Sequence, residues 1–426
     1  MTSLLHMPLK KRSSVSARIL LLSLLFLDAS AARAEGGWWP ALSGTLTGGY
    51  WSHSRNLDNE ENLFVTTLGL KGVSRAGEAG SLHAEGWVMD EGLFNQNNGK
   101  GMLREGYLDI SEGPFDLRIG KQVLAWGRAD QINPTDNLSP RDYTLLFSDD
   151  NDQRIGSSGI KLSAEFSGLV FQGYWLPFFK PDRIPLPSSA SFSVGETEPE
   201  NAFGDWGIKL EYSGSAGDGS LSYYDGYDLF PDVGPGITGG PDLMLSHHRI
   251  RTIGMDGAAV VGRFGLRGEA AYTQTENPDG FDPFIKSPFI FMVVGGERTY
   301  LEYLNVNIQF LVRSVFNYHD PEGEADPAVR SVAVQESLLN NELDASSQGM
   351  TLRVGDKWMN ETLEAECAVI YMFTRHDYLI RPKASYAITD NWKVLAAADI
   401  FRGPAESYFG YLADNSTAVL ELSYHF

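Results

Sequence analysis

Apolar and polar residues alternate in many segments of the chain after about residue 40. The C-terminal segment 417–426 shows the pattern most clearly: apolar side chains occupy the even positions from Ala418 to Phe426, with Glu421 and Ser423 between them. Successive residues of a β-strand point to opposite faces, so a period of two predicts strands with one apolar and one polar face. We therefore expect an all-β fold.

Further segments repeat this alternation, with charged residues in mid-strand opposite an apolar face. They include 205–212, 264–273, 306–317, 363–374, 380–388 and 392–400. In a soluble barrel the apolar face would point inward, whereas in a membrane barrel it faces lipid and the charged face lines the lumen. Aromatic residues near strand ends, such as Trp206, Trp358 and Trp392, fit an interfacial girdle. We expect a transmembrane antiparallel β-barrel.

The connections between the expected strands alternate in length. Tight turns are predicted at about 74–80, 112–114, 167–168, 214–218, 262–263, 303–305, 359–361 and 389–391. Outer-membrane barrels have short periplasmic turns and long extracellular loops. Counting on this basis predicts about 18 strands, within a range of 16–18, and both ends of the barrel on the periplasmic side. A barrel of this size encloses an aqueous lumen.

The composition excludes several other classes of protein. The net charge of −21 argues against a nucleic-acid partner, because phosphate binding needs a basic face. The single cysteine excludes a disulfide framework and a Cys-rich zinc site. After the N-terminus, no apolar run reaches the roughly 18 residues that a membrane-spanning helix needs.

Residues 1–34 are predicted to be a secretory signal peptide. Lys10, Lys11 and Arg12 begin a basic region, residues 19–27 form an apolar stretch, and 32–34 read Ala-Arg-Ala, a typical cleavage site. The expected mature protein, 35–426, is one β-barrel in the outer membrane of a Gram-negative bacterium, surrounded by lipid and lipopolysaccharide.

Two long segments interrupt the strand pattern. Segment 128–155 is too rich in Pro, Asn and Asp for a strand and too long for a turn. It is expected to constrict the lumen, with Arg128, Arg141 and Arg154 either meeting an anionic solute or pairing with neighbouring aspartates to hold the loop against the wall. Segment 319–346 is a long extracellular loop that contains a short helix, which we expect to be solvated rather than folded over the pore mouth.

Two positions do not fit the alternation. Lys121 falls on the apolar face of its strand and would point to lipid unless Gly120 forms a bulge. Strand 249–261 needs a bulge to place Arg249, Arg251 and Asp256 on one side.

The segment Arg118-Ile-Gly-Lys-Gln-Val-Leu-Ala-Trp-Gly-Arg128, followed by Asn-Pro-Thr-Asp-Asn at 133–137 and Pro-Arg-Asp at 140–142, resembles proteobacterial alginate-export porins. It is also similar to a related porin-like family without assigned function. This block covers about 40 residues, and the signal peptide, strand count and C-terminal Phe426 extend the resemblance over the whole chain. The resemblance implies an 18-stranded barrel that passes an anionic polysaccharide or similar solute. It also implies that the barrel assembly machinery recognises Phe426.

The face assignments and the segment 128–155 together predict a set of pore-lining residues. These are Arg118, Arg128, Asp130, Arg141, Asp142, Arg154, Lys209, Arg267, Arg313, Arg353, Arg381 and Lys383. Glutamates and aspartates share the inward faces, so the predicted lumen is mixed, with a slight cationic excess. This differs from the purely cationic lumen that a dedicated polyuronate exporter would need.

We expect a passive channel rather than an enzyme. No Gly-x-Ser-x-Gly motif and no metal-ligand spacing of the histidines is present, so no catalytic residue, metal or cofactor is predicted. Export of an anionic polymer requires an open cationic track, whereas diffusion of small anionic solutes requires a tight constriction of mixed sign. The alternative is a plugged barrel with a structural or surface-binding role, which would not conduct.

Overall fold

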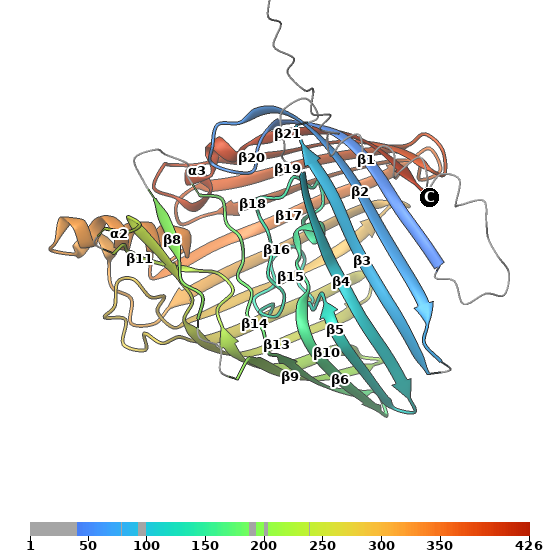
Figure 1. Cartoon of the computed structure of the whole chain (residues 1–426), viewed down its shortest axis with the longest axis horizontal. Helices are drawn as coiled ribbons and strands as arrows, with labels where there is room; N and C mark the ends of the chain where they lie inside the picture. Colours follow the sequence, from blue (N-terminus) through green and yellow to red (C-terminus); the bar gives the residue numbers. More distant parts are fainter. Residues whose placement is uncertain (1–40, 78, 93–98, 187–192, 200–202, 238) are drawn as a thin grey trace, which may run out of the picture.

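Eighteen strands form one closed antiparallel sheet, as predicted (Figure 1). Each strand pairs with its neighbours, and β21 pairs with β1 to close the ring. This computed structural model describes residues 41–77, 79–92, 99–186, 193–199, 203–237 and 239–426. The predicted signal peptide 1–34 lies outside the described residues and stays a prediction.

The barrel strands carry the labels of Figure 1. They are β1 (Ala41–His53), β2 (Glu61–Arg75), β3 (Gly80–Glu91), β4 (Gly99–Glu112), β5 (Phe115–Gln122), β6 (Ser157–Phe166), β7 (Leu169–Leu176), β9 (Asp205–Gly214) and β10 (Gly217–Tyr227). The ring continues with β13 (Arg249–Val261), β14 (Phe264–Gln274), β15 (Phe289–Tyr300), β16 (Leu304–Val315), β17 (Ser346–Trp358), β18 (Leu363–Met372), β19 (Asp377–Ala387), β20 (Trp392–Arg402) and β21 (Thr417–His425).

Short turns join the strands at one end of the barrel, at the predicted places. At this end the ring is sealed by Phe426 and Gly44, whose backbones exchange hydrogen bonds of 2.9 and 3.0 Å. A side chain on Gly44 would collide with the Phe426 ring. Short turns are periplasmic in outer-membrane barrels, so the opposite end, with the long loops, is extracellular.

The barrel has an apolar outside and a charged inside. Outward residues in mid-strand, such as Leu221, Ile253 and Val294, are 59–61% exposed. Inward residues such as Glu269 and Gln309 are buried. Only a hydrocarbon environment makes an apolar exterior favourable over this height, so the architecture is that of a Gram-negative outer-membrane barrel.

Aromatic residues form the expected girdles at both ends of this apolar band. Tyr212, Trp358 and Trp392 are exposed beside periplasmic turns, and Trp206 is exposed at the extracellular end of β9. Amphipathic rings favour the headgroup region, so these residues mark the two interfaces.

Of the two alternatives for Lys121, the structure shows the outward position and no bulge at Gly120. The pairing of β5 is continuous through Gly120, so Lys121 stays on the outward face, and its ammonium donates to the Leu103 carbonyl at 2.5 Å. The irregularity lies instead in β4, where the register with β3 skips Arg104.

Strand β13 pairs with β10 and β14 without a register shift. Arg249 and Arg251 therefore face outward at the extracellular end, where both pair with Asp225, while Asp256 faces the lumen. A shared carboxylate outside the barrel satisfies the two arginines, so no bulge is needed.

An extracellular lid covers one side of the pore mouth. It consists of a three-stranded sheet, β8 (Val194–Glu196), β12 (Leu243–Ser246) and β11 (Asp232–Pro235), and helix α2 (Pro327–Leu339). Shorter helices are η1 (Asp150–Gln153), η2 (Pro321–Gly323), α3 (Tyr408–Tyr411) and η3 (Ala413–Asn415). None of the helices in the described part of the chain is long and apolar enough to cross a bilayer.

Helix α2 lies where a helix was predicted but is not a solvated surface helix. Asp326 caps its first turn, accepting from the Ala328 N–H at 2.8 Å. Its buried face includes Ala333, and Val332 and Leu339 pack against the apolar cluster of Ile184 and Val233. The preference for a solvated helix was wrong because the partner surface comes from loops distant in sequence.

We expect Leu420→Arg to destabilise the barrel by about 2–4 kcal/mol, the cost of a basic residue facing lipid near the bilayer midplane. Leu420 is 54% exposed on the outer face. Ser423→Arg on the same strand is the matched control, because Ser423 lines the lumen. Urea unfolding of barrels refolded into lipid vesicles measures both; equal destabilisation would contradict the assignment of faces.

Candidate functional site

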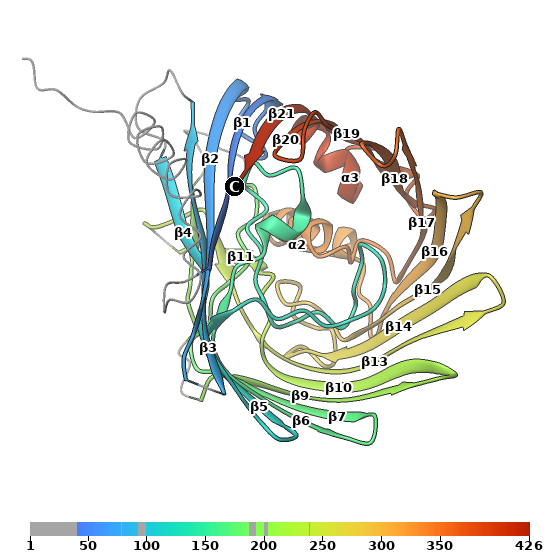
Figure 2. The same ribbon diagram turned by 90° about the vertical axis from the view of Figure 1, so that its right-hand side faces the viewer.

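The segment between β5 and β6, residues 123–156, runs through the barrel interior (Figure 2). Apolar contacts hold it to opposite walls. Leu124 and Trp126 pack against Tyr174 and Tyr224, while Leu146 packs with Trp51 on the far side. The lumen segment, as we call residues 123–156, is therefore a fixed partition of the pore.

Polar contacts fix its first part to the wall formed by β9, β13 and β14. The Arg128 guanidinium binds Glu211 and Asp256, the latter at 2.6 Å. The buried Glu269 carboxylate accepts from the backbone N–H groups of Arg128, Ala129 and Thr135 at 2.7–3.1 Å. One carboxylate of the wall thus satisfies three backbone donors of the segment.

The other predicted charges of the lumen segment are also paired. Asp130 accepts from Arg353 of β17 at 2.7 Å. Arg154 and Arg141 both approach Asp136, at 2.5 and 3.7 Å. Asp142 is buried and accepts from Thr144 within its own turn. For Arg128, Arg141 and Arg154, the geometry follows the alternative in which ion pairs hold the segment in place.

The predicted residues on the barrel wall all face the interior but do not form one track. Arg118 pairs with Asp109, Lys209 with Glu211, Arg267 with Glu297, and Arg313 with Glu342. Arg353 and Arg381 reach the lumen segment. Among the described residues, Lys383 has no ion-pair partner within 4.0 Å. It lines a cavity of about 570 Å³ on the periplasmic side of the lumen segment.

Two cavities lie on opposite sides of the lumen segment. The lower cavity, of about 570 Å³, opens among the periplasmic halves of β1–β3 and β19–β21. Four basic and four acidic side chains line it: Lys71, Arg104, Lys383 and Lys393, with Glu85, Asp149, Asp152 and Glu421. This cavity therefore has no cationic excess.

The upper cavity, of about 200 Å³, lies between the lumen segment, α2 and α3. Its rings come from Tyr143, Phe230, Phe401, Tyr408, Phe409 and Tyr411. Asp150 and Gln153 face this cavity, whereas Asp149 and Asp152 face the lower one. The single helical turn η1 is therefore the partition between the two cavities.

The polar floor of the upper cavity is a group of two arginines and two aspartates. Arg381 donates to Asp399 at 2.8 Å and to Asp150 at 2.8 Å, and Arg55 pairs with Asp399 at 3.1 Å. Arg141 also lines the cavity. Burial raises the pKa of the Asp150 carboxyl, but the hydrogen bonds and charge of Arg381 outweigh it, and the pKa lies below its usual range. Asp150 is therefore ionised and held by Arg381.

Sequence reasoning predicted Arg381 and Arg141 but missed Arg55, Asp399 as a partner and the aromatic walls. Arg55 lies in the short β1–β2 connection, and Tyr408 in the β20–β21 connection. Neither connection has a local pattern that marks a pore residue. Their meeting depends on closure of the ring between β21 and β1.

The lid is anchored by buried charges centred on Lys286. Its ammonium lies 3.0 Å from Asp232 and 3.2 Å from Asp228. Asp232 also binds His248 Nδ1 at 2.6 Å, a contact that raises the pKa of His248 against the opposing effect of burial. Burial alone would raise the pKa of Asp232, but Lys286 and His248 hold it well below its usual range.

Comparisons with known proteins identify a matching family and several solved structures with a similar fold. A family described as "Protein of unknown function (DUF1302)" matches residues 95–426. No curated protein matches the chain. The fold is similar to that of Pseudomonas aeruginosa OccK11 (OpdR), with a TM-score of 0.54 at 11% identity over 91% of this chain and 96% of that one.

Two further solved structures are similar over most of their length. P. aeruginosa OpdK with vanillate has a TM-score of 0.53 at 10% identity, covering 90% of this chain and 98% of that one. A BenF-like porin from Pseudomonas fluorescens Pf-5 has a TM-score of 0.56 at 10% identity, covering 92% and 99%. At these identities the likeness establishes the porin-type fold.

We expect Glu269→Ala to release the first part of the lumen segment. Each buried N–H left without its acceptor costs about 1–3 kcal/mol, so the segment should become sensitive to protease and the single-channel conductance should rise. Glu364→Ala is the control, because Glu364 pairs with Lys357 and Lys393 on the wall. Unchanged conductance and protease resistance in Glu269→Ala would show that the apolar contacts suffice.

The lid should loosen as the pH rises above neutral. A histidine with a raised pKa in the folded state stabilises that state below its ordinary pKa of about 6.5, and this contribution is lost as the pH rises through the folded value. Asp232, Glu276 and Lys286 are the charged groups that act on His248. Limited proteolysis of the lid should therefore accelerate with pH in the wild type, and this dependence should disappear in His248→Ala but persist in the exposed-residue control His319→Ala.

Proposed function

We propose that this chain, which belongs to the DUF1302 family and folds as a porin-type barrel, is a passive outer-membrane channel for small organic anions. The preferred solute combines a carboxylate with an apolar, preferably aromatic, body. The observation that carries this proposal is the upper cavity, where aromatic walls enclose a floor of arginines.

The shape and chemistry of the upper cavity match such a solute. A volume of about 200 Å³ holds a single-ring compound but no long polymer segment. Aromatic side chains favour flat apolar bodies, and arginine binds carboxylates through paired hydrogen bonds. Arg55 and Arg381 balance Asp150 and Asp399 at this floor. Arg141 adds a third guanidinium, whose partner Asp136 lies 3.7 Å away and is also bound by Arg154.

Exchange of carboxylates offers a route past the partition. Asp150 belongs to the lumen segment, whereas Arg55, Arg381 and Asp399 lie outside it. A solute carboxylate that replaces Asp150 on Arg381 would cost little, because one charge-assisted pair replaces another. The released turn η1 could then move and connect the upper cavity to the lower one, whose balanced charges bind an anion weakly enough to let it leave.

Two of the structurally similar proteins carry printed descriptions that name a solute or a related porin. One of them was solved with vanillate, an aromatic carboxylate, and another is described as BenF-like. At about one residue in ten identical, these structures say nothing of the solute of this chain, so the solute class rests on the upper cavity.

Two other functions remain to be separated by experiment. The resemblance to alginate-export porins suggests export of an anionic polysaccharide, but a polymer would need the lumen segment to leave walls to which it is held on opposite sides. A plugged barrel with a binding role is favoured by the same anchoring and by the packed α2. Lipopolysaccharide around the barrel and recognition of Phe426 by the assembly machinery stay predictions.

Current through the refolded full chain in a planar bilayer tests the proposal. We expect vanillate to block the current reversibly and with saturation, and its uncharged analogue vanillyl alcohol to block at least tenfold more weakly. Hydrogen bonds to a charged group contribute about 1.5–3 kcal/mol, or roughly 10–100-fold in affinity. Arg381→Gln should weaken the vanillate block by a similar factor, while Arg118→Gln, an arginine paired with Asp109 elsewhere on the wall, should not.

Each other outcome points to a different function. Equal block by vanillate and vanillyl alcohol would show that the arginines do not bind the carboxylate of the solute. Passage of short alginate oligomers with higher affinity than vanillate would favour polymer export. Absence of conductance in both the wild type and Glu269→Ala would favour the plugged barrel.

A further inference from the structure

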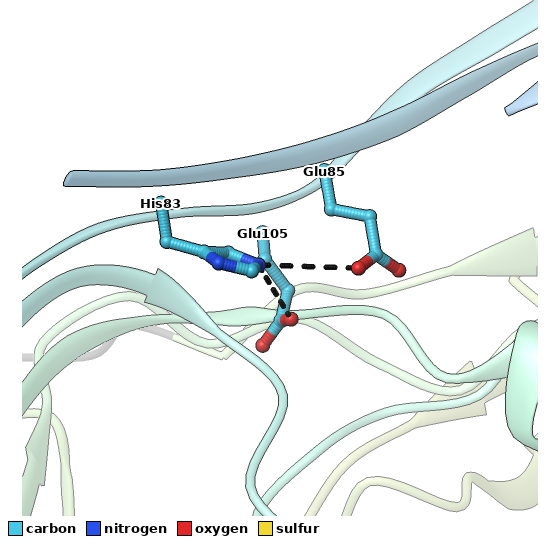
Figure 3. A group of neighbouring side chains, drawn as sticks. All are labelled: His83, Glu85 and Glu105. Atoms are coloured by element: carbon cyan, nitrogen blue, oxygen red, sulfur yellow. Dashed lines mark ion pairs between the residues drawn. The ribbon is translucent and has the colours of Figure 1, made fainter. Parts of the chain in front are cut away.

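Three ligand-type side chains converge on the barrel wall beside the lower cavity (Figure 3). His83 and Glu85 are two residues apart on the inward face of β3, and Glu105 of β4 is the register partner of Glu85. His83 Nε2 and one oxygen of each carboxylate lie within 4.8 Å of one another. The sequence had shown no metal-ligand spacing, because the third residue belongs to the neighbouring strand.

Each carboxylate uses one oxygen for a structural contact and turns the other toward the histidine. Glu105 Oε1 accepts from the Val123 N–H at 2.8 Å, and Glu85 Oε1 accepts from Arg104 at 3.0 Å. The Oε2 atoms lie 3.6 Å (Glu105) and 3.9 Å (Glu85) from His83 Nε2. The imidazole is held against the Tyr107 ring at a centroid distance of 4.7 Å. Outer contacts that orient ligands in this way are typical of metal sites.

The histidine nitrogen at the centre has no hydrogen-bond partner among the described residues, although His83 is only 9% exposed. Distances of 3.6 and 3.9 Å exceed the roughly 2.7–3.2 Å of an N–H···O hydrogen bond. Ligands about 2.0–2.2 Å from a tetrahedral zinc ion lie about 3.3–3.6 Å apart. The two nitrogen-to-oxygen distances are therefore too wide for a shared proton and within a few tenths of an ångström of those around a metal.

We propose that His83, Glu85 and Glu105 bind one divalent transition-metal ion at the wall of the pore. One imidazole nitrogen and two carboxylate oxygens suit Zn²⁺ or Mn²⁺ better than Mg²⁺ or Ca²⁺, which favour sites made of oxygen alone. Three protein ligands leave a coordination position for water or for the carboxylate of a passing solute. Glu85 itself lines the lower cavity, so an ion held there would also make that cavity more positive.

The surrounding charges permit a cation but oppose tight binding. Arg104 lies between Glu85 and Asp152, and Lys71 lies 3.7 Å from the Glu85 oxygen that faces His83. With Glu105, these make three carboxylates against two basic groups. The Lys71 side chain is 51% exposed, so it can turn aside into the cavity when an ion binds. Lys71 therefore competes with the metal for Glu85. Removing its charge should strengthen metal binding, whereas removing a ligand should weaken it.

Calorimetric titration of the refolded, chelator-treated full chain with Zn²⁺ at neutral pH tests the proposal, and Co²⁺ absorption reports the coordination. We expect one site, at least tenfold weaker binding in His83→Ala and Glu105→Gln, and tighter binding in Lys71→Met. His319→Ala, at an exposed histidine of the 316–345 loop, should bind as the wild type does. Mg²⁺ at millimolar concentration should not compete.

The proposal is overturned if the wild type and Lys71→Met bind no zinc up to millimolar concentration. It is equally overturned if His83→Ala binds zinc as the wild type does, which would place the ion elsewhere. Heat-modifiable migration in gels verifies that each variant is a folded barrel. Lys71→Met keeps all three ligands, so it tests the site even if a ligand variant fails to fold. None of these outcomes depends on the solute that the channel carries.

Discussion

The pairing of β21 with β1 is the contact on which the rest of this structure depends. In hydrocarbon, a strand edge leaves backbone N–H and C=O groups without partners, at a cost of several kcal/mol for each group. Closing the ring removes both edges at once and sets the inward or outward direction of every side chain. The cavities and ion pairs of the lumen depend on which side chains point inward.

The charged side chains that point into the barrel need partners of opposite charge, and the lumen segment supplies many of them. A charged group inside a narrow barrel is costly unless it is paired. Arg128 and Asp130 pair with wall residues of opposite sign, as do Asp150 and Asp152. The segment and the wall therefore neutralise each other. In the proposed mechanism, selectivity depends on which pair a solute can replace, and of these four pairs Asp150 with Arg381 is the one that borders the aromatic cavity.

Three parts of the chain that are far apart in sequence line the upper cavity. The wall contributes Arg381, the lumen segment contributes Asp150 and Tyr143, and the lid contributes Leu339. Lys286 holds the lid over this cavity through buried ion pairs. Movement of the lid and movement of η1 would open the cavity from opposite sides, as the proposed passage of a solute requires.

The amino-acid pattern was sufficient for the all-β class, the 18 strands, the turn positions and the presence of a helix near 328–343. These depend on local preferences: a period of two, turn-forming residues and a capped helical segment. Periodicity also assigned Arg381 and Arg267 to the inward face. It could not name their partners, because the period identifies a face and not the neighbour across it.

The partners come from register and closure. Glu85 meets Glu105 because of the β3–β4 pairing, next to a skipped residue that no sequence pattern announced. Arg128 meets Asp256 across 128 positions of the chain, and Arg55 meets Asp399 across the closing seam. Such contacts decide whether an arginine is a free site for an anion or a structural anchor. They belong to the folded barrel, because only the closed ring brings these strands within the few ångströms over which charges pair.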